Sequence, residues 1–520
     1  MIVEDQDAVL AFLSKTAAYP GASPAERVER IDTHSATVFL VGDDAYKLKR
    51  AVRYEYLDFS TLDRRRRFCE AEVALNRRVA PTLYRGVVPV TRAADGQLTL
   101  DGPGTPVEWL VHMRRFNTED LLDKIAGQGR LSIDQMPQLA QAVARLHALA
   151  QPCHGRHGSA VMRWVVDGNA RGFRDEGADV LAASLATRVT TTSHDAIAAQ
   201  AALLDARGKA GWIRHCHGDL HLGNIVMIDG TPVPFDAIEF NDDLACNDVL
   251  YDLAFLLMDL WRLDLRAQAN ALLNEYVTLS FGSEDCAALA LLPLFLSCRS
   301  AVRAKTSATA HRLQRDPSHS GALAGLARTY LEEADTLLRP HAPALVAIGG
   351  FSGSGKTTVA RAIADRIGAT PGALILRTDV LRKRLAGVPT AARLDPAAYT
   401  PARHAQVYDE LSTWARAVLA AGHAVIADAV FGDAAERDAI ERVAAEARVP
   451  FVGLWLDAPA AVLERRVAWR QHDASDATVD VVLKQLARGG GEIRWSRVDA
   501  SDAAARVVGR VRGILGRVLY

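Results

Sequence analysis

Two domains of different fold class are predicted by the sequence: an α+β domain followed by an α/β domain. The chain has 520 residues, which is too long for one ordinary hydrophobic core. Short β-rich runs with one helix fill the first part of the chain, and a helical pattern then continues to about residue 335. After residue 344, strands and helices alternate, which is typical of a parallel sheet covered on both faces.

The N-terminal domain begins with a small sheet. Residues 36–50 contain two β-rich runs on either side of a Gly-Asp-Asp turn and predict a hairpin. A helix is expected over residues 62–79, and it should end there because Pro81 follows. Further strands are expected within residues 83–100 and 107–116. Together these elements form a small lobe at about residues 25–116 of a domain that begins at residue 1.

A helical lobe is expected over about residues 117–336, interrupted by a hairpin of two short strands at residues 224–240. Two prolines bracket a polar segment at residues 337–344, which is interpreted as a linker. The first domain therefore covers residues 1–336. The second domain is expected over residues 345–520 and opens with the buried strand of LVAIGG.

Composition and charge exclude several classes of protein. Hydrophobic residues make up 49% of the chain and charged residues 24%, as in globular proteins. The 61 Lys and Arg residues balance 62 Asp and Glu residues, so a nucleic-acid partner is not expected. The basic run Arg64–Arg67 has acids nearby and is interpreted as a solvated helix face. The longest apolar runs are too short to span a bilayer, and no membrane association is expected.

Cysteine usage and the N-terminus predict a cytoplasmic protein. Six cysteines are scattered without a CxxC pair, which indicates free thiols in a reducing compartment and not a disulfide framework. The first residues, MIVEDQDAVLAFLSK, carry acids where a signal peptide would have a basic flank.

Residues 217–224, with the sequence HGDLHLGN, are rich in groups that transfer protons or bind metals. Asp219 and Asn224 are five residues apart, and the following hairpin carries Asp236. In this arrangement Asp219 can accept the proton of an attacking hydroxyl, while Asn224 and Asp236 can hold Mg²⁺ near the phosphates. A zinc site built from His215, His217 and His221 is the alternative, but a fourth ligand of suitable spacing is lacking.

This motif resembles the catalytic loop of protein kinases, and its HGDLHxxN form resembles the aminoglycoside phosphotransferase and choline-kinase-like family. Asp252, in NDVLYDLAFLL, matches the structural acid that follows the metal-binding hairpin in that family. The resemblance covers roughly residues 25–335. It implies a bilobal, protein-kinase-like fold that binds ATP.

The same resemblance implies a lysine on the small sheet and a glutamate on its helix. Lys47 and Lys49 share one strand face, and Glu72 lies on the predicted helix. The motif favours Lys47 paired with Glu72, with Lys49 as the alternative. The backbone of His112 and Met113 would form the hinge near adenine.

Residues 350–357, with the sequence GFSGSGKT, fit the pattern G-x-x-x-x-G-K-[ST] between a strand and a helix. The glycines let backbone N–H groups converge on phosphate oxygens at a helix N-terminus. Lys356 is expected to reach the β- and γ-phosphates, and Thr357 to bind Mg²⁺. The predicted ATP-binding residues are Gly350, Ser352, Gly353, Ser354, Gly355, Lys356, Thr357 and Thr358.

Polar residues after this loop suggest an acceptor site. Asp379 ends a predicted strand and can accept a hydroxyl proton, and Arg382 one turn later can hold the substrate. Asp428 lies where a Walker-B-like metal ligand would lie, with a helix cap as the alternative. Arg466 and Arg470 share one helix face and can close over ATP.

This second set resembles P-loop small-molecule and polynucleotide kinases, such as gluconate kinase, the phage polynucleotide 5′-kinase and zeta-toxin-like kinases. The resemblance implies that Asp379 is the base, Arg382 a substrate contact, and Arg466 and Arg470 the lid. The whole chain resembles bacterial bifunctional proteins that combine these two kinase types.

The leading hypothesis is a bifunctional ATP- and Mg²⁺-dependent kinase that phosphorylates hydroxyl groups of small metabolites. The alternative is one catalytic half with a nucleotide-binding regulatory half, because DTHSAT at residues 32–37 is not a glycine-rich phosphate loop. A kinase for protein or nucleic acid is a third possibility, although the neutral charge argues against nucleic acid. The sequence names neither the acceptors nor the oligomeric state.

Overall fold

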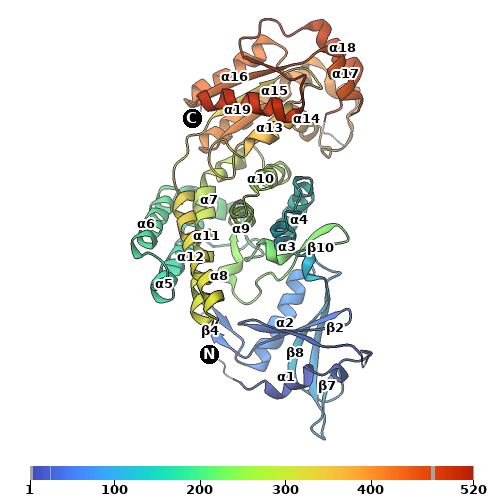
Figure 1. The fold of residues 1–520 in the computed structure, drawn as a ribbon, viewed down its shortest axis with the longest axis vertical. Coiled ribbons are helices and arrows are strands. Elements are labelled where there is room, and N and C mark those ends of the chain that lie inside the picture. The colour runs from blue at the N-terminus through green and yellow to red at the C-terminus, as the bar shows by residue number, and fades with distance from the viewer. Residues whose placement is uncertain (1–3, 24, 55, 315, 470–474, 519–520) are drawn as a thin grey trace. The chain divides into compact units, whose positions relative to one another are not determined.

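The computed structural model describes residues 4–23, 25–54, 56–314, 316–469 and 475–518 (Figure 1). The chain divides by its internal contacts into two compact units. Unit 1 contains residues 1–164 and 204–259. Unit 2 contains residues 165–203 and 260–520.

Unit 1 contains an antiparallel sheet in the order β1-β2-β3-β8-β6-β7. Its strands are β1 (Glu29–Asp32), β2 (Ala36–Val41), β3 (Asp44–Lys49), β6 (Tyr84–Arg92), β7 (Leu98–Leu100) and β8 (Thr105–Arg114). The pairing of β2 with β3 confirms the hairpin predicted at residues 36–50.

The two faces of this sheet are covered by different helices. On one face Tyr46 and Leu48 of β3 pack in a core with α1 (Asp7–Leu13). On the other face Ala45 packs in a core with α2 (Leu62–Asn76). Because side chains alternate along a strand, Lys47 and Lys49 share the α2 face with Ala45.

The remaining elements of unit 1 are mostly short. They are η1 (Thr16–Ala18), β4 (Arg53–Tyr54), β5 (Leu57–Asp58), η2 (Thr118–Asp120), α3 (Leu122–Gly127), η3 (Ile133–Gln135), α4 (Met136–Leu149), β9 (Ile213–His215), η4 (Leu222–Asn224), β10 (Ile225–Ile228), β11 (Thr231–Pro234), α8 (Asp242–Ala245) and β12 (Cys246–Asp248). Strands β10 and β11 confirm the predicted second hairpin.

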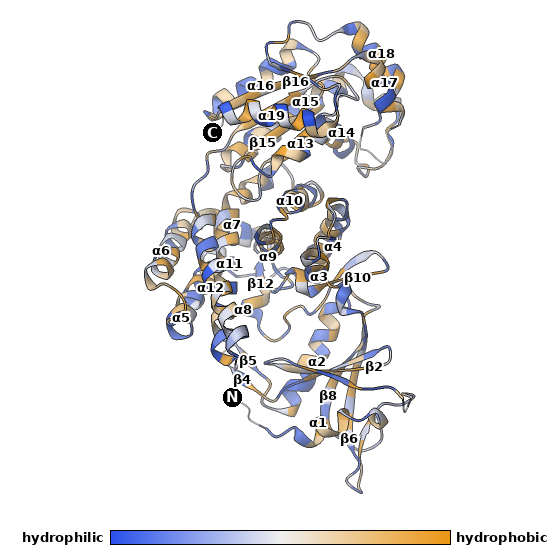
Figure 2. Ribbon diagram, in the orientation of Figure 1, coloured by the Kyte–Doolittle hydropathy of each residue, from blue (hydrophilic) through white to orange (hydrophobic). Residues whose placement is uncertain are grey.

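Three helices belong partly to each unit: α5 (Gly158–Asp175), α7 (Ala201–Lys209) and α9 (Val249–Arg262). Of these, α9 is strongly hydrophobic (Figure 2), and its residues 249–260 are buried throughout. A helix that is buried on all sides serves as a core element.

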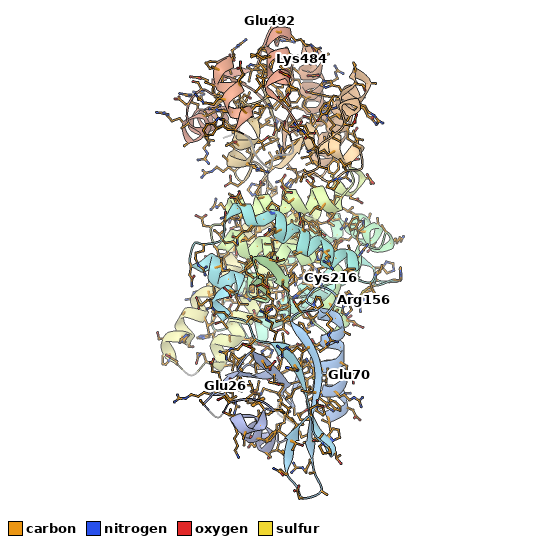
Figure 3. All side chains as sticks on the ribbon, turned by 90° about the vertical axis from the view of Figure 1, so that its right-hand side faces the viewer. Glu26, Glu70, Arg156, Cys216, Lys484 and Glu492 are labelled. Atoms are coloured by element: carbon orange, nitrogen blue, oxygen red, sulfur yellow. A yellow bond between two sulfur atoms is a disulfide. The ribbon has the colours of Figure 1, made fainter. Side chains whose placement is uncertain are left out.

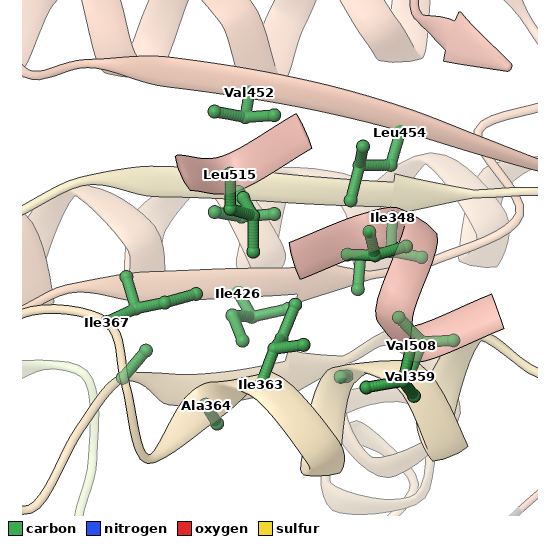
Figure 4. Close-up of a cluster of buried hydrophobic side chains, with 14 of the residues drawn as sticks. Ile348, Val359, Ile363, Ala364, Ile367, Ile426, Val452, Leu454, Val508 and Leu515 are labelled. Carbon is green, nitrogen blue, oxygen red and sulfur yellow. The ribbon is translucent and has the colours of Figure 1, made fainter. Parts of the chain in front are cut away.

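Unit 2 contains a parallel sheet in the order β14-β15-β13-β16-β17. Its strands are β13 (Leu345–Gly349), β14 (Leu374–Arg377), β15 (Val425–Asp428), β16 (Phe451–Asp457) and β17 (Ser496–Asp499). The predicted α/β class and its first four strands are confirmed, whereas β17 was not expected from the sequence. Figure 4 shows the core on one face, where Ile363 and Leu515 pack with Ile348 and Ile426.

The helices wholly within unit 2 are α6 (Ala183–Ala199), α10 (Arg266–Ser280), η5 (Glu284–Leu291), α11 (Leu292–Leu313), α12 (Pro317–Leu337), α13 (Lys356–Ala364), α14 (Thr378–Leu385), η6 (Pro396–Tyr399), α15 (Pro401–Ala420), α16 (Ala434–Ala447), α17 (Ala460–Ala468), α18 (Val479–Arg488) and α19 (Ala504–Val518). In the described part of the chain, one stretch, Glu284–Leu313, is long and apolar enough to cross a membrane. Its most apolar window is 72% buried inside the protein, as expected for a core helix.

The edge strand β14 is covered by side chains from α10. Asn270 Nδ2 donates to the carbonyl oxygens of Pro371 at 3.2 Å and Ala373 at 3.0 Å. Asn274 Oδ1 accepts from Ile375 N at 2.6 Å, and Asn274 Nδ2 donates to Ala373 O at 3.2 Å. An uncovered edge strand can pair with another chain, so these two asparagines protect the sheet.

This contact also affects how the chain is divided. Helices α10, α11 and α12 precede the predicted linker at residues 337–344, yet they belong to the same compact unit as the parallel sheet. The linker stays a prediction about sequence domains, whereas the contacts group residues 260–336 with the C-terminal domain.

The expectation of free thiols throughout is wrong for one pair, because Cys153 and Cys246 form a disulfide. The other four cysteines are free and buried, and Figure 3 labels one of them, Cys216. The partners of this disulfide are 93 residues apart, so no short spacing motif could indicate it.

The solvated-face interpretation of Arg64–Arg67 is wrong for Arg65. Its side chain is fully buried and donates to Glu108 Oε1 at 2.9 Å and to Phe59 O at 3.1 Å. Arg65 lies on the same α2 face as the buried Cys69 and Glu72, four and seven residues later. The other three arginines of the run are exposed.

Replacing Asn274 by alanine is expected to lower the free energy of unfolding of unit 2 by about 1–3 kcal/mol, because polar backbone groups of β14 lose their partner. Urea unfolding of the full chain, followed by tryptophan fluorescence, measures the change. The control is Arg266→Ala on the same helix, which removes an exposed ion pair with Asp264 and a contact of the guanidinium group with the Trp261 ring. Equal losses in both variants would contradict a specific role for Asn274.

Candidate active sites

A buried cluster of charges links the small sheet of unit 1 to α2. Lys47 Nζ lies 2.9 Å from Glu72 Oε1 and also pairs with Asp236. Lys49 Nζ lies 2.6 Å from Glu72 Oε2 and 2.5 Å from Glu239 Oε1. Both lysines therefore bind the same glutamate, but only Lys47 also reaches the predicted metal ligand Asp236.

The charges in this cluster shift the pKa of its members. Burial alone would raise the pKa of Glu72, but Lys47 and Lys49 lower it to about 2. Burial alone would lower the pKa of Lys47, but Asp236 and Glu72 raise it well above its usual value. Burial raises the pKa of Glu239. The glutamate and both lysines thus stay charged across the neutral pH range.

The loop that carries Asp219 is held by Asp252 from the first turn of α9. Asp252 accepts hydrogen bonds from His217 N at 3.1 Å and Gly218 N at 2.9 Å. Its Oδ2 also lies 3.2 Å from His147 Nε2. Burial lowers the pKa of His217, whose Nε2 donates to Phe235 O at 2.8 Å. The loop is thereby fixed at its base to α9 and to Phe235, the residue that follows β11.

A potential metal cluster among the described residues combines His147 and Asp252 with Cys216, whose ligand atoms lie within 4.8 Å of one another. It contains none of the three histidines of the predicted zinc alternative. Because Asp252 also anchors the loop backbone, these contacts give the group a structural role.

The side chain of Asn224 contacts Asp219 within this loop. Asn224 Nδ2 donates to Asp219 O at 3.0 Å and to Asp219 Oδ2 at 3.1 Å. His221 Nε2 lies 3.4 Å from the same carboxylate oxygen. The Asp219 side chain is 42% exposed, so its carboxylate is oriented by neighbours and still accessible to an acceptor hydroxyl.

Asp236 has a φ angle of 63°, in the left-handed region that non-glycine residues rarely adopt. Its backbone N donates to Tyr84 Oη at 3.0 Å, and the next backbone N, of Ala237, donates to Asn76 Oδ1 at 3.0 Å. Tyr84 and Asn76 come from distant elements and were not identified from the sequence. They hold the strained backbone that directs Asp236 toward Lys47.

The predicted hinge residues His112 and Met113 lie within β8. Met113 pairs with Ala45 of β3 on one side and with Tyr84 of β6 on the other. The contact of their backbone with adenine stays a prediction.

The phosphate loop of unit 2 connects β13 to α13, as predicted. Gly350 and Gly353 have φ angles of 138° and 86°. A side chain would bring Cβ within 2.5 Å of Leu456 O at Gly350 and 2.6 Å of Leu463 O at Gly353, so only glycine fits. Lys356 Nζ donates to Gly350 O at 2.9 Å and thus lies over its own loop.

The predicted metal ligands of unit 2 are in direct contact. Thr357 Oγ1 donates to Asp428 Oδ2 at 2.6 Å, and Asp428 is the buried last residue of β15. Arg377 Nε lies 3.5 Å from the same oxygen. The cap of α16 is instead Asp433, so the helix-cap alternative for Asp428 does not hold.

Asp379 and Arg382 lie on α14, because β14 ends at Arg377, two residues before Asp379. Burial raises the pKa of Asp379, and a hydrogen bond from Ser475 opposes the shift. Arg382 lies 5.0 Å from the ring of Tyr399, and its NH1 donates to Ala398 O at 3.1 Å. Arg382 is buried, and its Nε has no hydrogen-bond partner among the described residues.

The predicted lid arginines are only partly described. Arg466 donates to the carbonyl oxygens of Ala500 at 2.8 Å and Asp502 at 3.0 Å. Arg470 lies outside the described residues. Gln485 of α18, which was not predicted, accepts from Ser352 N of the phosphate loop at 2.9 Å.

These contacts define a two-part ATP-dependent kinase, with a protein-kinase-like site in unit 1 and a P-loop site in unit 2. The sequence model of the phosphotransferase enzyme family matches residues 28–289, and that of an AAA domain matches residues 345–489. The chain belongs to the phosphotransferase enzyme family and carries the AAA-type P-loop domain in addition.

Similar proteins match nearly the whole chain. Uncharacterized proteins of Mycobacterium tuberculosis and Mycobacterium bovis are 30% identical over 490 residues, which is 92% of this chain and 93% of theirs. Similar solved structures include a choline kinase of Cryptosporidium parvum, with 11% identity, a TM-score of 0.43, and 64% of this chain and 95% of that chain covered. Another is the Mycobacterium tuberculosis APS kinase CysC, with 22% identity, a TM-score of 0.24, and 34% and 99% covered.

The contacts of the two lysines predict different effects for their replacement. Lys47→Met is expected to raise the KM for ATP and to lower turnover by unit 1 at least 100-fold, because it removes the charge beside Asp236. Lys49→Met should mainly destabilise the fold, since it leaves buried Glu239 without its partner. ATP titrations and thermal unfolding of both variants measure these effects. A larger loss of activity in a stably folded Lys49→Met protein would reverse the assignment.

Proposed function

We propose that this chain is a bifunctional phosphotransferase, with each unit transferring the γ-phosphoryl group of ATP to a hydroxyl group of a small metabolite. One observation carries the proposal. In each unit a carboxylate is in direct contact with a second predicted site residue: Asp236 with Lys47 and Asp219 with Asn224 in unit 1, and Asp428 with Thr357 in unit 2. Lys356 and Asp379 complete the proposed set of unit 2.

In unit 1, Asp219 would accept the proton of the attacking hydroxyl, oriented by the amide of Asn224 and the ring of His221. Lys47 would exchange its contact with Asp236 for the phosphates of ATP while Glu72 keeps its side chain in place. Glu72 is therefore a positioning residue.

In unit 2, Lys356 would turn from its own loop carbonyls toward the β- and γ-phosphates. The raised pKa of Asp379 brings this carboxyl closer to the pKa range of an effective general base. Arg382, with an unpaired Nε, would bind the acceptor and hold it beside Asp379.

Both sites offer ligands that suit Mg²⁺, a hard cation that prefers carboxylate, amide and hydroxyl oxygens. Asn224 and Asp236 would hold it in unit 1, and Thr357 and Asp428 in unit 2. When bound, Mg²⁺ would neutralise charge on the phosphates.

The preference for a small acceptor over a nucleic acid is inferred from charge. The chain has a formal net charge of −1, which does not favour a polyanionic partner. We also propose a cytoplasmic location, where ATP is abundant, although the Cys153–Cys246 disulfide is unusual for that compartment.

A regulatory role for unit 1 is the second candidate, and one contact favours it. In place of a glycine-rich loop, the turn between β1 and β2 is closed by Thr37 Oγ1, which donates to Asp32 Oδ1 at 2.8 Å. This hydroxyl is thus already used within the protein. Such a unit could bind nucleotide without transferring phosphate.

Single-site variants of the full chain separate the two activities. Lys356→Ala should leave only the unit 1 reaction, and Asp219→Asn should leave only the unit 2 reaction. ADP release is measured with a panel of hydroxyl-bearing metabolites for each variant. If Asp219→Asn removes no acceptor-dependent activity with any metabolite, unit 1 is a binding module and the regulatory candidate is favoured.

Asp219→Asn and Asp236→Ala are expected to impair different steps of the unit 1 reaction. In the Lys356→Ala background, Asp219→Asn should lower turnover by about 10²–10⁴-fold with little change in ATP affinity, because it loses only general-base catalysis. Asp236→Ala should weaken Mg·ATP binding. Asp243→Asn, an exposed acid paired with Arg156, is the control. Identical kinetics for the first two variants would contradict separate roles.

Asp379→Asn should remove acceptor-dependent ADP release by unit 2 and spare slow hydrolysis of ATP, because the phosphate loop and metal ligands are untouched. In the Asp219→Asn background, the acceptor-dependent rate should fall as pH falls. Its midpoint should lie above the ordinary aspartate value of 3.8, because burial raises the pKa of Asp379 and the base must be deprotonated. Asp409→Asn, on the surface of α15, should behave like the parent. Loss of both activities together would indicate an ATPase and not a kinase.

A further inference from the structure

Phe431 lies three residues after Asp428 and has a φ angle of 51°, in the left-handed region that non-glycine residues rarely adopt. Its side chain is fully buried, and its ring centre lies 5.7 Å from that of Tyr408 and 5.1 Å from that of Trp495. A bulky residue keeps such a conformation only where its surroundings hold it, and residues of this kind are frequent at active sites. The groups that hold Phe431 are therefore candidates for a role in the reaction.

Two side chains bind the backbone of Phe431 from opposite ends of its peptide units. Tyr408 Oη, on α15, accepts from Phe431 N at 3.1 Å. Arg437 NH1, on α16, donates to Phe431 O at 2.7 Å. Helices α15 and α16 pack beside each other in unit 2 (Figure 1). The turn between β15 and α16 is thus fixed by both helices.

The residues just before Phe431 are bonded to the strand and loop that bind phosphate. Ala429 N donates to Ile348 O at 3.3 Å, and Val430 O accepts from Gly350 N at 3.1 Å. Gly350 is the first residue of the phosphate loop and has no room for a side chain. A change in the backbone of Phe431 would therefore move Val430, the hydrogen-bond partner of Gly350.

The hydroxyl of Tyr408 is protonated at neutral pH and so can both donate and accept. Burial and the charge of Glu436 raise the pKa of Tyr408 well above its ordinary value, and a hydrogen bond to Glu436 acts in the same direction. Glu436 is itself held by His404, whose Nε2 lies 2.6 Å from Glu436 Oε1. The charge of Asp379 adds to the pKa shift, so this hydroxyl shares the electrostatic environment of the proposed base.

Unit 1 contains the same device on a different fold. Asp236 has a φ angle of 63°, and its backbone N donates to Tyr84 Oη at 3.0 Å. In each unit a tyrosine hydroxyl from a distant element thus accepts from the backbone of a strained residue, at or just after a predicted metal ligand. Two unrelated sheets use one solution to the same steric problem.

We infer that Tyr408 is a positioning residue of the unit 2 site, whose hydroxyl holds the turn after Asp428 in the conformation that supports the phosphate loop. It acts through Phe431 and Val430 on Gly350. This role rests on the nucleotide binding proposed for unit 2 and adds to it a group outside the predicted ligands.

Isothermal titration calorimetry with Mg²⁺ and the non-hydrolysable analogue AMPPNP tests this role in the full chain. The parent carries Lys47→Met, which weakens binding by unit 1, and the remaining binding event is assigned to unit 2 if Lys356→Ala removes it. Tyr408→Phe keeps the ring and removes only the hydroxyl. It should raise the Kd for AMPPNP about five- to tenfold, because the turn loses one hydrogen bond that supports the loop.

The matched control is Tyr330→Phe, which removes a buried hydroxyl of unit 2 that accepts from Arg303 Nε at 3.4 Å. Tyr330 lies on α12, so the control should leave the Kd unchanged even where it lowers the unfolding temperature as much as Tyr408→Phe does. Hydrogen–deuterium exchange gives a second readout that needs no ligand. Exchange of the amides of residues 429–433 should increase in Tyr408→Phe and not in Tyr330→Phe.

Three outcomes would overturn the role of Tyr408. They are an unchanged Kd in Tyr408→Phe, an equal rise in Tyr330→Phe, and unchanged amide exchange at residues 429–433 in Tyr408→Phe. A parent chain that shows no binding event sensitive to Lys356→Ala would instead contradict the function proposed for unit 2, and the role of Tyr408 would fall with it.

Discussion

The carboxylate of Glu72 is the group on which the site of unit 1 depends. It is fully buried, and each of its oxygens binds a different lysine of β3. Removing a charge from water costs several kcal/mol unless a partner compensates it, so the five charges of this cluster stabilise one another. Lys47 in turn pairs with Asp236, and Lys49 pairs with Glu239. The cluster therefore joins the sheet, the helix and the segment that carries Asp236 and Glu239, so that none moves independently.

The two units meet similar chemical demands with different architecture. In unit 1 the catalytic loop is irregular and relies on Asp252, a residue outside the loop, to hold its backbone. In unit 2 the parallel sheet itself holds the site residues in place, because β13, β14 and β15 end at the same edge. The register places Arg377 beside Asp428, and Thr357 reaches the latter from the phosphate loop. A site built on strand ends needs fewer supporting side chains.

The parts that could be predicted from the sequence are those whose residues lie close together along the chain. The catalytic loop and the phosphate loop are each defined within eight residues, and the α/β class follows from alternating patterns. The supporting groups could not be predicted, because Tyr84, Asn76 and Gln485 act on residues more than 130 positions away. Arg65 was misread because its burial depends on Glu108, which lies 43 positions away in the chain.

The contact between α10 and β14 has a consequence for biosynthesis. Asn274 and Ala373 are 99 residues apart, with the helix first in the chain. At about 5–20 residues per second, a ribosome makes β14 roughly 5–20 s after α10. Helix α10 has thus already been synthesised when β14 emerges, so it can cover the edge strand as the sheet forms. A protein with these two kinase parts in the reverse order would expose that edge until α10 had been made.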